Sequence, residues 1–359
     1  MSEGKERIAA IATEVERRAC INSQEGAQIV ATMLRGLAKD MRSGGIAADL
    51  VAHFEGEPME ALPSLRLAGG LHRAALEGRA LALRPFLPTV GGRFNPASDD
   101  VALEAAAVAT IHEEFEVLAD YLNGPPQTND VGRSSGLVGA FLQVAAETRM
   151  PLDLMEIGTS AGLNLCFDRF RYQLGGFAWG DPASGVILSP RWEGPAPRID
   201  APLAVRRRLG ADLFPIDVHR SEAPLRLASY IWPDQPERAK RLLAAIEIAR
   251  RTDRHLECAS ADHWLATQLC NVTPGVVRVV FNSAMWSYMP TTVANAVVAL
   301  ISDAGSRATT ATPLAWITLE PGINVHPAGS EIAVTVWPGG QRRVLGLAHT
   351  HGHWVRWNG

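Results

Sequence analysis

The chain has 359 residues and a formal net charge of −4, and 47% of its residues are hydrophobic while 20% are charged. These values are typical of a globular protein of roughly two domains, and they exclude a disordered chain. The negative charge argues against nucleic acid as a partner, because phosphate binding needs a basic face, and no apolar run approaches the roughly 18 residues of a membrane span.

The first 125 residues are predicted to form an α-helical region. Apolar residues recur every three or four positions through residues 5–42, and the same spacing runs through residues 62–83 and 101–122. This period is typical of a helix with one buried face. Prolines between these stretches mark the expected breaks, and Pro125 with Pro126 ends the region.

Residues 126–359 are predicted to form one α/β domain. Short apolar runs predict seven strands at residues 152–157, 211–218, 255–259, 276–281, 314–319, 332–336 and 344–347. Helical spacing falls between several of them, at residues 161–170, 236–251, 262–270 and 291–304. This alternation is typical of a mostly parallel sheet with helices on both faces. The Pro-Gly-Gly sequence at 338–340 predicts a closing hairpin between the last two strands.

The segment 152–165 joins a predicted buried strand to a predicted helix through a turn of Gly, Ser and Ala residues. Small residues let a backbone approach a ligand closely, and a helix N-terminus offers N–H groups to an anion. A dinucleotide fingerprint needs glycine at the positions of Gly158, Ser160 and Leu163, and two of these three fail. Two other chemistries could use this segment.

One of them is serine hydrolysis. Residues 158–162 match the G-x-S-x-G nucleophile elbow, with Ser160 as the nucleophile. Glu320 and one of the histidines at 349, 351 and 353 follow in the order acid, then histidine. However, the residues before Ser160 have helical spacing and carry no motif for an oxyanion hole, which a hydrolase elbow normally requires.

The other chemistry is methyl transfer, because residues 156–162 resemble the adenosyl-methionine loop of class I methyltransferases. That loop is an acidic residue followed by x-G-x-G-x-G, and serine replaces the middle glycine here. Asp212 or Asp217, after the second strand, would accept hydrogen bonds from the ribose, and Asp262, after the third, would reach the adenine amine. The loop residues expected at the cofactor are Glu156, Gly158, Thr159, Ser160, Gly162 and Asn164.

The fourth predicted strand ends in a polar and aromatic segment at residues 282–290. Ser283 and Trp286 are expected at the cofactor, because open α/β sheets bind ligands at the carboxyl ends of their strands. Trp286 and Tyr288 could form an aromatic wall for the ligand. The alternative is that both rings pack in the core.

The histidines at 349, 351 and 353 would share one face of a regular strand. Alternate histidines can bind a metal, but no second cluster of ligands accompanies them, and we predict no metal site. His351 is instead the candidate general base. His351 and Tyr288 are the candidate catalytic residues.

Residues 127–133 are rich in amide and hydroxyl groups just before a helix. Gln127, Thr128 and Asn129 are expected in the wall of the cofactor pocket, and the alternative is that Thr128 or Asn129 caps the helix. Arg133 could pair with a carboxylate of the ligand or of the protein.

These motifs together resemble a known family, the bacterial domain-of-unknown-function family numbered 2332. The resemblance covers nearly the whole chain, and the family commonly has Glu at the position of Asp130. It implies a methyltransferase-like (Rossmann-like) sheet and a helical N-terminal region, but no particular reaction. The segments that carry it are residues 127–133, 156–165, 230–235, 337–340 and 351–357.

The sequence therefore predicts an α/β protein with a seven-stranded, mostly parallel sheet and a helical N-terminal region. The expected function is that of an S-adenosyl-L-methionine-dependent methyltransferase acting on a small molecule. A serine hydrolase using Ser160 and a non-catalytic adenosyl-methionine-binding protein, or a degenerate methyltransferase fold, are the alternatives. Four scattered cysteines without a C-x-x-C pair predict a cytoplasmic protein. Neither nucleic acid nor membrane is an expected partner, and the oligomeric state stays open.

Overall fold

The computed structural model describes residues 2–52, 62–321 and 329–359. Contacts divide the chain into two units. A helical unit comprises Met1–Thr128 and Glu222–Lys240, and an α/β unit comprises Asn129–Ser221 and Arg241–Gly359. The chain thus returns to the helical unit after residue 221. The predicted division into residues 1–125 and 126–359 did not include this return.

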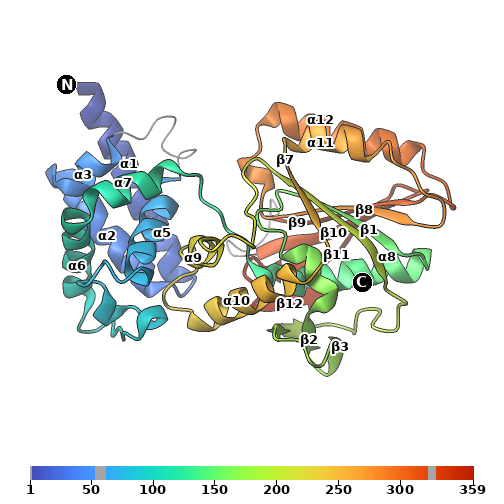
Figure 1. The fold of residues 1–359 in the computed structure, drawn as a ribbon, viewed down its shortest axis with the longest axis horizontal. Helices are drawn as coiled ribbons and strands as arrows, with labels where there is room; N and C mark the ends of the chain where they lie inside the picture. Colours follow the sequence, from blue (N-terminus) through green and yellow to red (C-terminus); the bar gives the residue numbers. More distant parts are fainter. Residues whose placement is uncertain (1, 53–61, 322–328) are drawn as a thin grey trace. The chain divides into compact units, whose positions relative to one another are not determined.

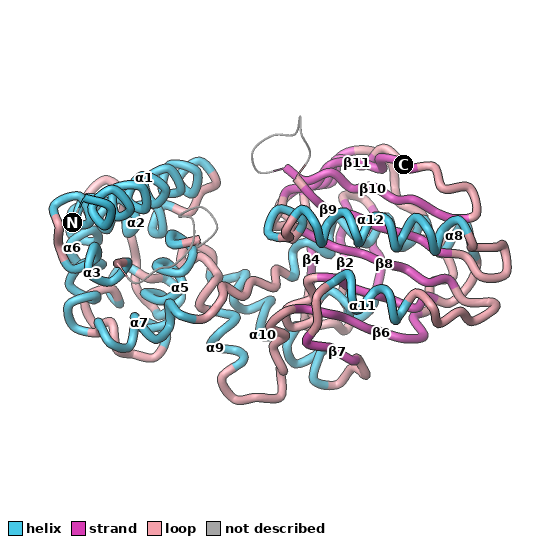
Figure 2. The backbone as a smooth tube through the Cα atoms, turned by 90° about the horizontal axis from the view of Figure 1, so that it is seen from above, coloured by secondary structure: helices cyan, strands magenta, loops and turns pink. Residues whose placement is uncertain are grey.

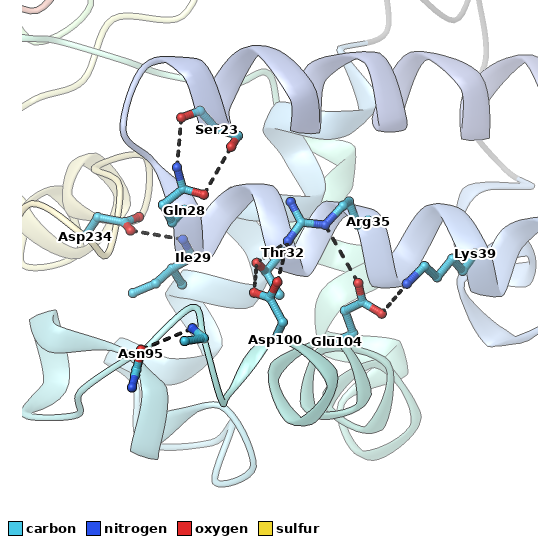
Figure 3. A network of polar contacts seen from close by, with 11 residues as sticks. Ser23, Gln28, Ile29, Thr32, Arg35, Lys39, Asn95, Asp100, Glu104 and Asp234 are labelled. Atoms are coloured by element: carbon cyan, nitrogen blue, oxygen red, sulfur yellow. Dashed lines mark hydrogen bonds and ion pairs between the residues drawn. The ribbon is translucent and has the colours of Figure 1, made fainter.

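The helical unit packs its helices around one apolar core (Figure 1). Ile29, Met33 and Leu37 are among its buried residues, so the predicted helical spacing is confirmed there. Polar contacts join α2 to α6: Thr32 donates to Asp100 at 2.8 Å (Figure 3). The helices are α1 (Ser2–Gln24), α2 (Gln28–Ser43), α3 (Ile46–Val51), α5 (Pro63–Leu76), α6 (Asp100–Glu113), α7 (Phe115–Asn123) and α9 (Ala223–Ala228), with the short 3-10 helices η1 (Arg84–Phe86) and η2 (Pro88–Val90).

The returning segment completes the helical unit. The first turn of α2 has no cap from Ala27, and the Asp234 carboxylate accepts the Ile29 N–H at 3.0 Å instead (Figure 3). Buried His72 of α5 bonds the carbonyl oxygen of Ser229 at 3.1 Å. The segment 230–235 therefore has a structural role, because its Asp234 satisfies a donor that the N-terminus of α2 alone leaves unpaired.

In the part of the chain that the structure describes, the α/β unit is built on a sheet of nine strands, not the seven predicted. Its order is β5-β12-β11-β10-β9-β8-β1-β6-β7, and β3-β2-β4 form a second, small sheet. The run β7-β6-β1-β8-β9 is parallel, as is β12 with β5, whereas β9 to β12 are antiparallel. The strands are β1 (Leu152–Ile157), β2 (Arg171–Leu174), β3 (Phe177–Gly180), β4 (Ile187–Leu188), β5 (Arg191–Glu193), β6 (Val205–Asp212), β7 (His255–Cys258), β8 (Val277–Ser283), β9 (Leu314–Glu320), β10 (Gly329–Trp337), β11 (Arg342–His349) and β12 (Trp354–Trp357).

Helices cover both faces of this sheet (Figures 1 and 2). Helices α11 (Ala261–Gln268) and α12 (Thr291–Ser306) share a core with Met155 and Val280 on one face. On the other face, Phe141 of α8 (Ser134–Thr148) meets Phe281 edge-on at 5.1 Å. Helix α10 (Pro236–Arg250) precedes β7. No helix among the described residues is long and apolar enough to cross a membrane.

The predicted strand at 211–218 is misplaced, because β6 ends at Asp212. Three consecutive arginines interrupt the apolar pattern by which a buried strand is recognised in a sequence. Their charges are paired within the fold: Arg206 and Arg207 contact the buried carboxylate of Asp153, and Arg208 contacts Asp168 at 2.6 Å. Paired in this way, charged residues can occupy a strand inside a sheet.

The predicted helix at 161–170 does not form. A loop and the irregular 3-10 helix η4 (Asn164–Arg169) follow β1, and the chain then enters β2. The buried side chain of Asn164 accepts a hydrogen bond from Ser134 at 2.7 Å. Leu163 donates its N–H to the Asn129 side chain at 2.9 Å, so contacts with the preceding segment replace helical bonds.

Candidate functional site

The chain order reverses at β1, because β6 and β7 follow on one side of it while β8 and β9 follow on the other. In open α/β sheets, ligands bind beyond the carboxyl ends of the strands at such a reversal. The loop at 158–163 leaves β1 at this point. Gly158 has a φ of +69°, and an added Cβ would lie 2.9 Å from the Met285 side chain, so the turn requires glycine.

The backbone N–H groups of this loop are bonded within the protein. Gly158 and Thr159 both donate to the Ala211 carbonyl, at 2.9 and 3.1 Å. Ser160 donates its N–H to the Asp212 carboxylate at 2.8 Å. Gly162, with φ at +66°, donates to the Thr159 carbonyl at 2.8 Å. Since no helix follows, the loop and its neighbours satisfy donors that were expected to meet the ligand.

Ser160 combines two unfavourable features. Its φ is +51°, in the left-handed region that non-glycine residues rarely adopt. Its Oγ is buried and has no hydrogen-bond partner among the described residues. Both features raise the energy of the folded state, and such strain is often found at functional sites.

Glu156 is a buried carboxyl group that holds its proton near neutral pH. It lies in β1, is 2% exposed, and accepts a hydrogen bond from Thr159 Oγ1 at 2.7 Å. Burial raises its pKa to about 8, against the lowering effect of Thr159 and Arg133. Near pH 7, most molecules therefore carry a neutral Glu156.

Residues 129–133 pack beside this loop. Asp130 accepts the Gly132 N–H at 2.9 Å through one carboxylate oxygen and contacts His351 Nδ1 at 2.6 Å through the other. Arg133 donates to the Ser283 carbonyl at 3.0 Å. Gln127 and Thr128 belong to the helical unit, whereas Asn129 and Arg133 belong to the α/β unit.

The three histidines do not share a strand face, because β11 ends at His349 and the chain then turns. Gly352, with φ at +74°, lies within that turn. His351 donates its backbone N–H to His349 Nδ1 at 3.0 Å, and the rings of His349 and His353 stack with centroids 4.3 Å apart. No group of three or more His, Cys, Asp or Glu side chains suited to a metal occurs among the residues described.

The three aspartates proposed for adenosine differ in their surroundings. Asp212 ends β6 and accepts N–H groups from Ser160 and Phe214. Asp217 is exposed and accepts the His219 N–H at 2.9 Å, so it stabilises a turn. Asp262 lies in the first turn of α11, where a hydrogen bond with a neighbouring serine lowers its pKa.

The sequence of this site and of the units around it matches a family as a whole. A family model described as "Uncharacterized protein conserved in bacteria (DUF2332)" matches residues 12–357. The chain belongs to this family. Comparison with curated proteins finds no match, and comparison with solved structures finds none either. The DUF2332 assignment names no reaction, so function must be argued from the site.

The segment after β8 in this DUF2332 chain borders a cavity of about 250 Å³. Trp286, which lies in the 3-10 helix η5 (Trp286–Tyr288), lines it, whereas Tyr288 is 59% exposed and does not. Trp316 of β9 also lines it, and sequence reasoning missed this residue. The sequence did carry a signal for it: an aromatic residue at 316 and polar residues at 318 and 320 stand at every second position up to the end of a strand, so they share one face of that strand.

Proposed function

We infer that this protein is an S-adenosyl-L-methionine-dependent methyltransferase acting on a small molecule. The observation that carries the proposal is the carboxylate of Asp212. It lies at the carboxyl end of the strand beside β1, and it bonds the loop of β1 through the Ser160 N–H at 2.8 Å. An acid beside this loop suits the ribose hydroxyls of the cofactor, and the reversal of strand order at β1 is where such sheets bind ligands.

The surroundings of Asp212 fit an adenosine. Leu213 and Phe214 follow it with 58% and 54% of their surfaces exposed, so apolar surface for an adenine lies next to the acid. The loop N–H groups, by contrast, are engaged, and Met285 lies against Gly158. The amino-acid end of the cofactor would therefore need a different partner.

Arg133 fits that role. Its Nε is buried and has no hydrogen-bond partner among the described residues. A ligand carboxylate would satisfy this donor and form a charge-assisted bond with the guanidinium. Asp212 and Arg133 would thus hold the two ends of the cofactor, and no loop N–H would be required.

His351 is the residue that we propose for proton transfer. We propose that Asp130 is ionised and accepts the proton of His351 Nδ1 in their 2.6 Å contact, which would make Nε2 the basic nitrogen of the neutral ring. Adenosyl-methionine supplies an electrophilic methyl group when bound. His351 would take the proton of a hydroxyl or amine acceptor, and the remaining residues would act by positioning.

Calorimetric titration with adenosyl-methionine and adenosyl-homocysteine tests this proposal. We expect micromolar binding, and we expect Asp212→Asn to weaken it roughly 10-fold or more, because a charge-assisted hydrogen bond contributes about 1.5–3 kcal/mol. Asp217→Asn is the matched control and should leave the affinity unchanged. Absence of binding by the folded protein would refute the proposal, and binding without turnover of any acceptor would favour a non-catalytic binding protein.

One observation keeps a serine hydrolase as the second candidate: the positive φ of Ser160 in a sharp turn after β1, as in a nucleophile elbow. The carboxylate partner of the histidine would be Asp130 and not Glu320. A fluorophosphonate probe should then label the wild type but not Ser160→Ala. Ser135→Ala is the matched control and should still be labelled, because the hydroxyl that it removes is also buried without a partner among the described residues. Unlabelled wild-type protein would exclude this candidate.

A further inference from the structure

The cavity beside Trp286 has a polar floor and aromatic walls. Trp316, Thr318 and Glu320 line it from alternate positions of β9, so they project from the same face of the sheet. Asn282 of β8 lines it as well and is fully buried. A volume of about 250 Å³ suits the head group of a small molecule.

A hydrogen bond fixes one of the two aromatic walls. The rings of Trp286 and Trp316 have centroids 5.8 Å apart and planes tilted by 44°, so they form two sides of one corner. Trp316 Nε1 donates to Asn282 Oδ1 at 3.0 Å, which fixes the orientation of its ring. Indole faces carry negative electrostatic potential and attract cations.

Glu320 adds a carboxylate to this corner. Its Oε1 accepts from Asn282 Nδ2 at 2.7 Å and from the Met285 N–H at 3.2 Å, and its Oε2 accepts from the Trp286 N–H at 3.3 Å. All three donors are neutral amides, and a carboxylate has about four acceptor positions, so one remains on Oε2. Burial raises the pKa of Glu320 against the lowering effect of its three amide donors and of the nearby charge of Arg133, so these partners do not fully offset the loss of hydration.

The cation that lines the cavity is already paired. Arg342 contacts Glu331 through a salt bridge on the neighbouring strands β10 and β11. The remaining charge at the lining is that of Glu320, so the cavity favours a positive guest.

We propose that this cavity binds a small organic cation, such as a methylated ammonium group, against Trp286 and Trp316 with Glu320 as its counter-ion. This binding site is independent of the methyltransferase proposal. Its ligands would be recognised by their charge and by aromatic contact rather than by a particular scaffold.

Choline and its uncharged carbon isostere, in which a tert-butyl group replaces the trimethylammonium group, test the inference by calorimetry on the full chain. We expect choline to bind at least tenfold more tightly than the isostere. Trp316→Leu and Glu320→Gln should each weaken choline binding at least tenfold, whereas Trp179→Leu, which removes a tryptophan outside the cavity lining, should not.

Equal binding of choline and the isostere, or no binding of choline by the wild type, would overturn the inference, as would full affinity in folded Trp316→Leu. If a variant fails to fold, the wild-type comparison of the two probes still decides. The same titration with adenosyl-methionine and adenosyl-homocysteine tests whether the cation that binds in the cavity is a free small molecule or the sulfonium of the cofactor. A preference for the sulfonium that Trp316→Leu abolishes would identify the cofactor itself as the guest.

Discussion

Replacing Glu156 with Gln should change how the stability of the α/β unit depends on pH. The pKa of Glu156 is about 8 in the folded protein, whereas the unfolded chain releases this proton near the ordinary glutamate pKa of 4.5. Between these values the folded state binds more protons, so stability falls as pH rises. The difference between the folded and unfolded pKa values of Glu156 corresponds to at most about 5 kcal/mol of unfolding free energy.

Denaturant unfolding of wild type and Glu156→Gln between pH 5 and pH 9 measures this effect. Tryptophan fluorescence reports mainly on the α/β unit, because eight of the nine tryptophans lie in it. Near pH 5 the two proteins should have similar stability, since both side chains are then neutral. The variant should gain stability relative to the wild type by roughly 1.4 kcal/mol per pH unit up to about pH 8. A difference that does not change with pH would refute the reasoning.

Two further predictions concern stability. Gly158→Ala should destabilise the protein by about 1–3 kcal/mol, because alanine disfavours a positive φ and its Cβ would press on Met285. Gly176→Ala is the control, because an added Cβ there meets nothing within 4 Å. Its free energy of unfolding should stay within about 0.5 kcal/mol of the wild type in the same denaturation experiment. Burial lowers the pKa of His72 to about 4, so below about pH 6.5 the unfolded state binds more protons than the folded state. The free energy of unfolding should therefore fall by up to about 3 kcal/mol as the pH is lowered from about 6.5 to 4. His72→Gln should flatten that slope, and an unchanged slope would contradict the assignment.

Apolar patterning located the elements whose stability comes from burial. Every residue of β1 and β8 is buried, and both strands were predicted close to their observed bounds. The start of β6 was missed because its arginines find their partners in distant segments, which no local pattern reports. The four-residue strand β12 was missed because it is short and carries an arginine.

The candidate site was predictable in part. The order of the strands along the chain predicted Asp212 or Asp217 beside the loop of β1, since carboxyl ends of parallel strands share one edge, and Asp212 is the one that bonds this loop. The contact between Asp130 and His351 spans 221 residues and depends on how the last turn folds back on residues 129–133. The cavity at Trp316 depends on the hydrogen bond that the Trp316 indole N–H donates to Asn282, a residue whose buried position is not evident from its type.

The cap on α2 has a consequence for how the protein is made. Ile29 and the Asp234 carboxylate that accepts its N–H are 205 residues apart. At translation rates of about 5–20 residues per second, the ribosome needs roughly 10–40 s to deliver the cap after the helix has been synthesised. Until then the first helices lack a part of their own unit, so a nascent chain shorter than about 240 residues cannot contain a complete copy of either unit.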